Sequence, residues 1–202
     1  MGICYIVGAG ELDATFTPLD SDLVIAADGG YDSLRSHSIR CDLLVGDLDS
    51  VSSTPNGVQT LRYKVEKDET DMHLAFAEGY ARGYRDFRIY GGGGGRIDHT
   101  FANYSLLLYA KMRGADIKMV TRDFVTQVLY NGCDSLKGEY GAHLSIFAFG
   151  GVAEGVCIRG AKYELCDARL LPEFPLGVSN SFLDTPVFIE VKSGALLIMQ
   201  GT

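Results

Sequence analysis

Four aspartates stand where short apolar runs end or a helical segment begins: Asp28, Asp47, Asp49 and Asp71. Open α/β sheets bind their ligands at the carboxyl ends of strands. Carboxylate oxygens are the hard ligands that Mg²⁺ prefers, together with water and substrate phosphates. The i, i+2 spacing of Asp47 and Asp49 directs both side chains to one side of an extended backbone. Because such carboxylates repel one another without a cation, their conjunction favours a metal–phosphate site.

Each of these aspartates, taken alone, also has a structural explanation. Asp28-Gly29 is a common turn pair. Asp68 or Thr70 would cap the helix that follows, with Asp71 near its positive end. A single Asp-x-Asp is frequent in loops. The three acidic clusters together, at successive strand ends, favour a metal–phosphate site over these structural explanations.

A run of five glycines, Gly91–Gly95, links a predicted strand to a predicted helix and is followed by Arg96. Ordering so many glycines costs conformational entropy. Such a run is therefore expected where the backbone must approach a ligand closely. Exposed N–H groups beside a helix N-terminus bind anions, and Arg96 would add a bidentate phosphate contact. The run matches neither the Walker A pattern nor G-x-G-x-x-G. The structural alternative is a flexible surface loop with Asp98 as helix N-cap.

Periodicity predicts the elements that position these loops. Helices are expected at Tyr31–His37, Asp71–Tyr84 and Asp98–Arg113, the last with a core-facing side made of Phe101, Tyr104, Leu107 and Leu108. Strands are expected at Ile3–Val7, Leu23–Ala27, Leu43–Val45 and Phe87–Tyr90. Strands separated by helices predict a largely parallel sheet covered on both sides.

The pattern changes after about Gly114, where short strand candidates follow one another without helices: Ile117–Val120, Val125–Tyr130, His143–Phe149, Val156–Arg159, Val187–Val191 and Ala195–Met199. Turn signals separate them at Asn131-Gly132, Lys137-Gly138, Gly150-Gly151 and Ser193-Gly194. This spacing predicts a small antiparallel sandwich. We therefore expect two domains, an α/β domain over residues 1–118 and an all-β sandwich over residues 119–202.

Composition narrows the class of function. The chain has 202 residues, 47% of them hydrophobic, and a formal charge of -8, which disfavours nonspecific nucleic-acid binding. Its five cysteines lack CxxC spacing and its four histidines lack metal-ligand spacing, so no zinc site is indicated. The sequence shows neither a signal peptide nor an apolar run near the roughly 20 residues of a membrane span. A cytoplasmic protein that does not bind membranes is expected.

Taken together, the motifs resemble those of the thiamine pyrophosphokinase family. They are Ala27-Asp28-Gly29-Gly30, Gly46-Asp47-Leu48-Asp49-Ser50, Lys67-Asp68-x-Thr70-Asp71, the glycine run with Arg96-x-Asp98-His99, and Gly177-Val178-Ser179-Asn180. The resemblance implies an N-terminal α/β domain, a C-terminal β-sandwich and a homodimer with active sites between subunits. It also implies transfer of pyrophosphate from ATP to thiamine, giving thiamine diphosphate and AMP.

The same resemblance implies roles for individual residues. Asp47, Asp49 and Asp71 would hold Mg²⁺ and the triphosphate, and Lys67 and Arg96 would neutralise phosphate charge. The ATP site would further include Asp28, Gly29, Thr70, Gly92, Gly94 and Gly95. The thiamine site would include Asp98, Ser179 and Asn180, with Phe182 or a tyrosine replacing the tryptophan that some members stack on thiamine. Asp71 is our choice for the group that accepts the hydroxyl proton or orients the nucleophile.

Two other functions fit parts of the pattern. Strand-end Asp-x-Asp also serves phosphatases and nucleotidyl hydrolases, where Asp47 would carry a covalent phosphoryl group. A non-catalytic sensor of ATP or thiamine is a second alternative, disfavoured because a pure binder has little use for so many carboxylates.

Overall fold

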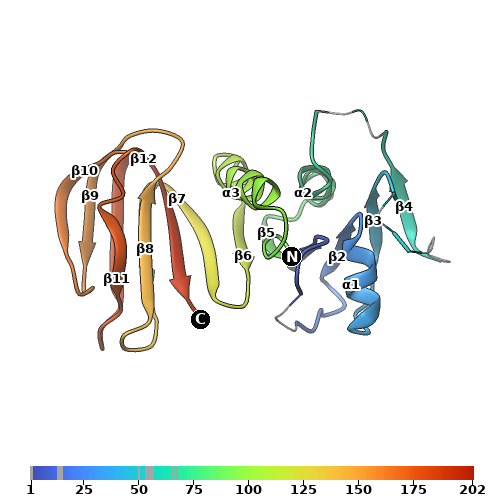
Figure 1. Cartoon of the computed structure of the whole chain (residues 1–202), viewed down its shortest axis with the longest axis horizontal. Helices are drawn as coiled ribbons and strands as arrows, with labels where there is room; N and C mark the ends of the chain where they lie inside the picture. The colour runs from blue at the N-terminus through green and yellow to red at the C-terminus, as the bar shows by residue number, and fades with distance from the viewer. Residues whose placement is uncertain (1, 13–15, 50, 53–56, 65, 67) are drawn as a thin grey trace. The chain divides into compact units, whose positions relative to one another are not determined.

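The computed structural model describes residues 2–12, 16–49, 51–52, 57–64, 66 and 68–202 (Figure 1). The chain forms two compact units. The first comprises Met1–Leu106 and Gly114–Thr121, and the second comprises Leu107–Arg113 and Arg122–Thr202. No helix within the described ranges is long and apolar enough to cross a lipid bilayer.

Strands and helices are interspersed along the first part of the chain: β1 (Cys4–Val7), β2 (Leu23–Ala27), α1 (Gly30–Ser36), β3 (Leu43–Gly46), β4 (Gln59–Arg62), α2 (Asp71–Ala81), β5 (Asp86–Tyr90), α3 (Ile97–Lys111) and β6 (Asp116–Val120). All of them belong to the first unit except the end of α3, which from Leu107 onward belongs to the second. The strands pair in the order β6-β5-β1-β2-β3-β4, and every pair is parallel. Because the strands run the same way, the loops that follow β1, β2, β3 and β5 leave one edge of the sheet.

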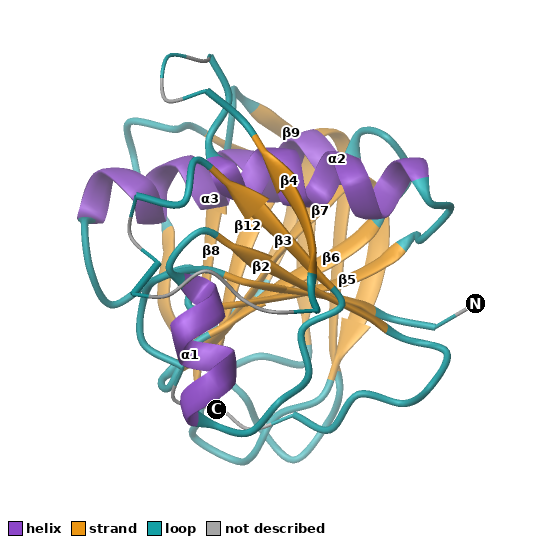
Figure 2. Cartoon of the chain, turned by 90° about the vertical axis from the view of Figure 1, so that its right-hand side faces the viewer, coloured by secondary structure: helices purple, strands orange, loops and turns teal. Residues whose placement is uncertain are grey.

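The central strands β1, β2 and β3 are buried on both faces, which explains why they are apolar throughout. On β1, Tyr5 and Val7 pack in one cluster with Leu34 of α1. Cys4 points to the other face, where its Sγ atom would lie 2.7 Å from a Cβ atom at Gly79 of α2. Figure 2 accordingly shows α1 and α2 on opposite sides of the parallel strands. Glycine at position 79 lets α2 approach the sheet closely.

The second unit contains β7 (Phe124–Leu136), β8 (His143–Ala148), β9 (Ala153–Arg159), β10 (Leu165–Leu170), β11 (Gly177–Ser181) and β12 (Val187–Gly201). All of its strand pairs are antiparallel. Strand β12 pairs with β7 along its length, with β9 over its first half and with β8 over its second half. Inward side chains of these strands, among them Ile146 and Ile158, form one buried cluster with Phe182, which follows β11.

The turns predicted at Asn131-Gly132 and Ser193-Gly194 are wrong, because both pairs lie inside long strands. The β7–β12 register shifts between Val191 and Ala195, so the extra residues form a bulge. Asn131 has a φ of 45° and its Oδ1 accepts a hydrogen bond from the Gly194 N–H at 2.9 Å. Turn-forming residues thus serve here to bend a strand. Strands β4, β10 and β11 were not predicted.

The buried face predicted for α3 is also wrong in part. Phe101 is 62% exposed, whereas the buried side chains are those of Asn103, Leu106, Leu107 and Ala110. These positions follow an i, i+3, i+4, i+7 stripe that includes a polar residue and leaves Phe101 outside it. A search for apolar periodicity alone misses such a stripe.

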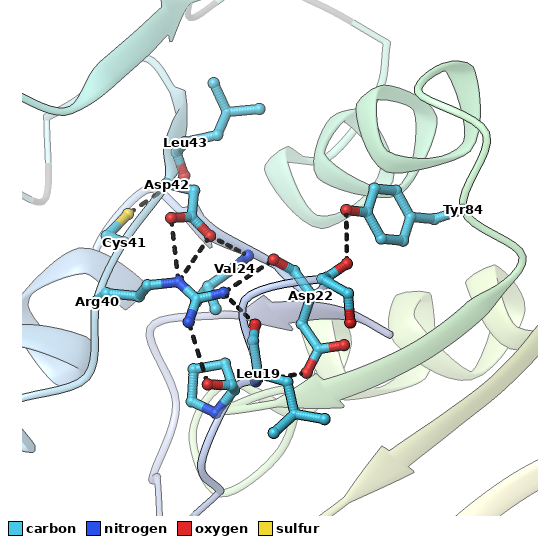
Figure 3. Close-up of polar contacts among 10 residues, drawn as sticks. Leu19, Asp22, Val24, Arg40, Cys41, Asp42, Leu43 and Tyr84 are labelled. Carbon is cyan, nitrogen blue, oxygen red and sulfur yellow. Dashed lines mark hydrogen bonds and ion pairs between the residues drawn. The ribbon is translucent and has the colours of Figure 1, made fainter. Parts of the chain in front are cut away.

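At the amino ends of β2 and β3, Arg40 forms hydrogen bonds with the segments that lead into these two strands (Figure 3). Its guanidinium donates to the carbonyls of Pro18 (3.1 Å), Leu19 (2.7 Å) and Asp22 (2.9 Å), and its Nε donates to Asp42 Oδ1 (3.2 Å). This edge is opposite to the one where β2 and β3 deliver their aspartates. We therefore assign Arg40 to stability.

Replacing Arg40 with Ala is expected to lower the free energy of unfolding by about 2 kcal/mol, because charged hydrogen bonds to three carbonyls are lost together. Urea denaturation measures the change. The exposed Arg62, at the end of β4, provides the control, and Arg62→Ala should change stability by less than about 0.5 kcal/mol. Equal effects of the two substitutions would contradict this assignment.

Candidate functional site

Three carboxylates converge at the carboxyl edge of the parallel sheet. Asp28 follows β2, and Asp47 and Asp49 follow the neighbouring strand β3. Each residue offers a carboxylate oxygen that lies within 4.8 Å of those offered by the other two. The parallel pairing of Ala27 with Val45 creates this proximity, because it brings the two strand ends level. The group is suited to a divalent cation.

The backbone around Asp28 is specialised for this position. Asp28 has a φ of 47°, and its N–H donates to the Val45 carbonyl at 2.8 Å. A Cβ atom at Gly46 would lie 3.0 Å from Asp28 Cβ, so glycine there makes room for the aspartate. Asp28 Oδ1 is buried and has no hydrogen-bond partner within the part of the chain that the structure describes. A buried carboxylate oxygen without a donor is costly, and a bound cation would satisfy it.

The Asp47–Asp49 loop turns back on itself. The Asp49 N–H donates to Asp47 Oδ1 at 3.0 Å, and Leu48 between them has a φ of 69°. The two side chains are therefore not simply i and i+2 on an extended strand. The predicted convergence of Asp47 and Asp49 holds, but a local turn produces it.

Thr70 and Asp71 stand at the start of α2. Thr70 is its N-cap, with Oγ1 accepting from the His73 N–H at 3.2 Å, as the structural alternative expected. Asp71 occupies the first turn and lines the same cavity as Asp28 and Asp47. It is a neighbour of the three-carboxylate group, which consists of Asp28, Asp47 and Asp49.

This cavity has a volume of about 460 Å³ and lies within the first unit. It brings together seven of the predicted site residues: Asp28, Asp47, Thr70, Asp71, Gly92, Gly95 and Arg96. Gly29 is the N-cap of α1, and Gly94, with a φ of 79°, lies beside the side chain of Glu11. Lys67, predicted to neutralise phosphate charge, lies outside the described residues, as does Ser50.

A second glycine loop, Gly8-Ala9-Gly10, packs against the glycine run and was missed by the sequence reasoning. The Gly8 N–H donates to the Tyr90 carbonyl at 2.9 Å, and the Gly10 N–H donates to the Gly91 carbonyl at 3.0 Å. A Cβ atom at Gly10 would lie 2.2 Å from the Gly93 oxygen. Two glycines directly after the first predicted strand were the available signal.

Arg96 and Asp98 form an exposed ion pair, with Nη2 and Oδ2 2.6 Å apart and side chains 72% and 62% exposed. The hydrogen bond from Arg96 holds the pKa of the Asp98 carboxyl below its ordinary value. Since exposed pairs contribute little stability, Arg96 can exchange Asp98 for another anion at small cost.

In the second unit, the side chain of Asn180 is occupied by the protein itself. Its Oδ1 accepts from the N–H groups of Tyr163 and Ser181, both at 2.9 Å, and its Nδ2 donates to the Tyr163 carbonyl at 2.7 Å. The neighbouring Ser179 has a φ of 60° and an exposed side chain. Phe182 is fully buried at 0% exposure, so the suggestion that it stacks on a ligand is wrong.

Comparison with known proteins agrees with the motifs. Residues 19–119 match the family model described as thiamin pyrophosphokinase, catalytic domain. Residues 134–196 match the model described as thiamin pyrophosphokinase, vitamin B1 binding domain. The chain belongs to the thiamine pyrophosphokinase family.

Individual relatives of this family are distant in sequence but close in fold. A curated thiamine pyrophosphokinase from Bacillus subtilis is 26% identical over 190 residues, covering 93% of this chain and 84% of that protein. A crystal structure of thiamine pyrophosphokinase from Bacillus subtilis superposes with a TM-score of 0.88 at 22% identity, covering 99% of both chains. A thiamin pyrophosphokinase family protein from Enterococcus faecalis gives 0.84 at 25% identity, covering 98% of both.

The contact between the two glycine loops yields a prediction. Gly10→Ala should lower the free energy of unfolding by about 2 kcal/mol, because the new Cβ must displace the Gly93 carbonyl. Gly95→Ala is the matched control, since a Cβ there meets nothing within 4 Å, and its change should stay within about 1 kcal/mol. Chemical denaturation of both variants tests the pair; a Gly10→Ala protein as stable as wild type would refute the packing described.

Proposed function

We propose that this chain transfers the β,γ-pyrophosphoryl group of ATP to the hydroxyl of thiamine, giving thiamine diphosphate and AMP. The observation that carries the proposal is the convergence of Asp28, Asp47 and Asp49 beside a cavity walled by glycine backbone. Carboxylates suited to a divalent cation and N–H-rich backbone suited to anions are complementary parts of a polyphosphate site. Family membership supplies the identity of the two substrates.

The donor set fits Mg²⁺, and we propose Asp28, Asp47 and Asp49 as the residues that hold it. The buried, unpartnered Asp28 Oδ1 supports this assignment. When bound, the cation would offset negative charge on the phosphate oxygens. Asp71, which the resemblance also implies as a ligand, lines the same cavity, and we place it beside the acceptor hydroxyl.

Positioning and charge neutralisation carry most of such a transfer. The thiamine hydroxyl oxygen bonds to the β-phosphorus, the bond from that phosphorus to the oxygen bridging to the α-phosphate breaks, and AMP leaves with the electron pair. Asp71 orients the hydroxyl and accepts its proton. Arg96 exchanges Asp98 for phosphate oxygens. Lys67 adds a second positive charge.

We propose that the two units divide the substrates. The parallel unit acts as the α/β domain for ATP, with Gly29, Thr70, Gly92, Gly94 and Gly95 shaping its loops, and the antiparallel unit acts as a β-sandwich that binds thiamine. The predicted domain limits, residues 1–118 and 119–202, remain a proposal; the main boundary between the two compact units lies nearby, between Thr121 and Arg122. We further propose a cytoplasmic homodimer in which Asp98 meets the thiamine pyrimidine.

On the thiamine side, Ser179 is the proposed contact and Asn180 supports it by fixing the backbone of Tyr163. Tyr163 is 59% exposed, so it is the tyrosine we propose in place of the buried Phe182.

Product analysis tests the reaction. Incubating the protein with ATP, Mg²⁺ and thiamine should give AMP and thiamine diphosphate in equal amounts by mass spectrometry. ADP with thiamine monophosphate would refute pyrophosphoryl transfer, and a phosphoaspartate trapped at Asp47 would support a hydrolase instead.

Asp71→Asn is expected to lower kcat about a thousandfold, corresponding to several kcal/mol of lost transition-state stabilisation. The fold should be unchanged, since Thr70 rather than Asp71 caps α2. Asp20→Asn, which removes a charge from an exposed loop, is the control and should retain wild-type turnover. Turnover near wild type in Asp71→Asn would exclude its role.

A further inference from the structure

Asn103 is a buried polar residue on the inner face of α3, with 5% of its surface exposed. Its Nδ2 donates a hydrogen bond to the Gly92 carbonyl at 2.7 Å, and the residue lines the cavity. A main-chain carbonyl only accepts hydrogen bonds, so the amide nitrogen must face Gly92. A polar side chain is otherwise a poor choice for a buried helix stripe, and its partner in the glycine run suggests a reason for it.

Three successive carbonyls at the start of the glycine run are each held by a donor. Tyr90 O accepts from Gly8 N, Gly91 O accepts from Gly10 N, and Gly92 O accepts from Asn103. Carbonyl oxygens repel a bound phosphate, so an anion site requires them to be turned away and kept there. The first two restraints come from backbone, and the third comes from a side chain.

The restraint on Gly92 also fixes the next N–H. In a trans peptide the Gly92 C=O and the Gly93 N–H point in opposite directions, so holding the carbonyl toward Asn103 directs the N–H away from it. Within the described ranges the Gly93 N–H has no acceptor. Gly93 lines the cavity. Gly92 is closely packed, since a Cβ atom there would lie 2.7 Å from Met119 Sδ.

We propose that Asn103 is a positioning residue that orients the Gly92–Gly93 peptide so that its N–H binds a phosphate oxygen of the nucleotide. The inference rests on the proposed function for the identity of the ligand, a magnesium-bound nucleoside triphosphate. It assigns Asn103 to ATP affinity and leaves thiamine affinity to other residues.

The test uses Asn103→Leu, which keeps the side-chain size and removes the donor, with Ser105→Ala at an exposed position of α3 as the matched control. Calorimetry with α,β-methylene-ATP and Mg²⁺ measures nucleotide affinity without turnover, and titration with thiamine alone measures the other substrate. Asn103→Leu should bind the analogue about tenfold or more weakly, the loss expected for a hydrogen bond to a charged group. Its thiamine affinity, and both affinities of Ser105→Ala, should stay within about twofold of wild type.

An unchanged analogue affinity, or an equal loss for the analogue and thiamine, would overturn the proposal. If the leucine variant does not fold, ¹⁵N-glycine-labelled wild-type protein tests whether the Gly93 N–H binds phosphate. The Gly93 amide signal, assigned by its loss in Gly93→Ala, should move on addition of inorganic tripolyphosphate with Mg²⁺. A Gly93 signal that stays in place while other glycine signals move would refute the assignment. Wild type that binds the analogue but forms no AMP would count against the proposed function and not against this one.

Discussion

The structure of the first unit depends on holding three carboxylates together against their mutual repulsion. Asp28, Asp47 and Asp49 offer oxygens within 4.8 Å of one another, and one oxygen of Asp28 is buried without a donor. Carboxylates held this close repel one another when no cation lies between them. The arrangement persists because the parallel register of β2 and β3 fixes both strand ends, and because Gly46 leaves room for Asp28. Holding these carboxylates together is therefore electrostatically unfavourable, and a bound divalent cation would offset the repulsion between them.

The glycine-rich wall of the cavity is the complement of that acidic group. Glycines are costly to order, yet here their lack of a side chain allows two loops to pack backbone against backbone, as Gly10 does against Gly91 and Gly93. Hydrogen bonds from Gly8, Gly10 and Asn103 hold the carbonyls of residues 90–92. The Gly93 N–H, which has no backbone acceptor within the described residues, is left at the wall of the cavity that Asp28 and Asp47 also line. Cation and polyphosphate would each offset the charge of the other.

Much of this organisation could be predicted from the sequence, because it depends on local pattern. The strand at Leu23–Ala27 and the convergence of Asp28 with Asp47 follow from apolar runs that end in acidic residues. The parts that could not be predicted depend on contacts between distant segments. Asn103 is identified as a site residue only by its bond to Gly92 and its place on the cavity wall. Asn131 lies inside a strand, opposite a bulge in β12, where its side chain accepts a hydrogen bond from Gly194.

The most direct measurement is anomalous diffraction from crystals grown with Mn²⁺ and α,β-methylene-ATP, with Mn²⁺ standing in for Mg²⁺. We predict a manganese peak at about 2.2 Å from carboxylate oxygens of Asp28, Asp47 and Asp49, a distance typical of hard divalent cations. The nucleotide phosphates should lie on the other side of the metal from these aspartates, against Gly93. A manganese peak away from these three aspartates would contradict the proposed metal site. Nucleotide phosphates bound on another face of the first unit would contradict it equally.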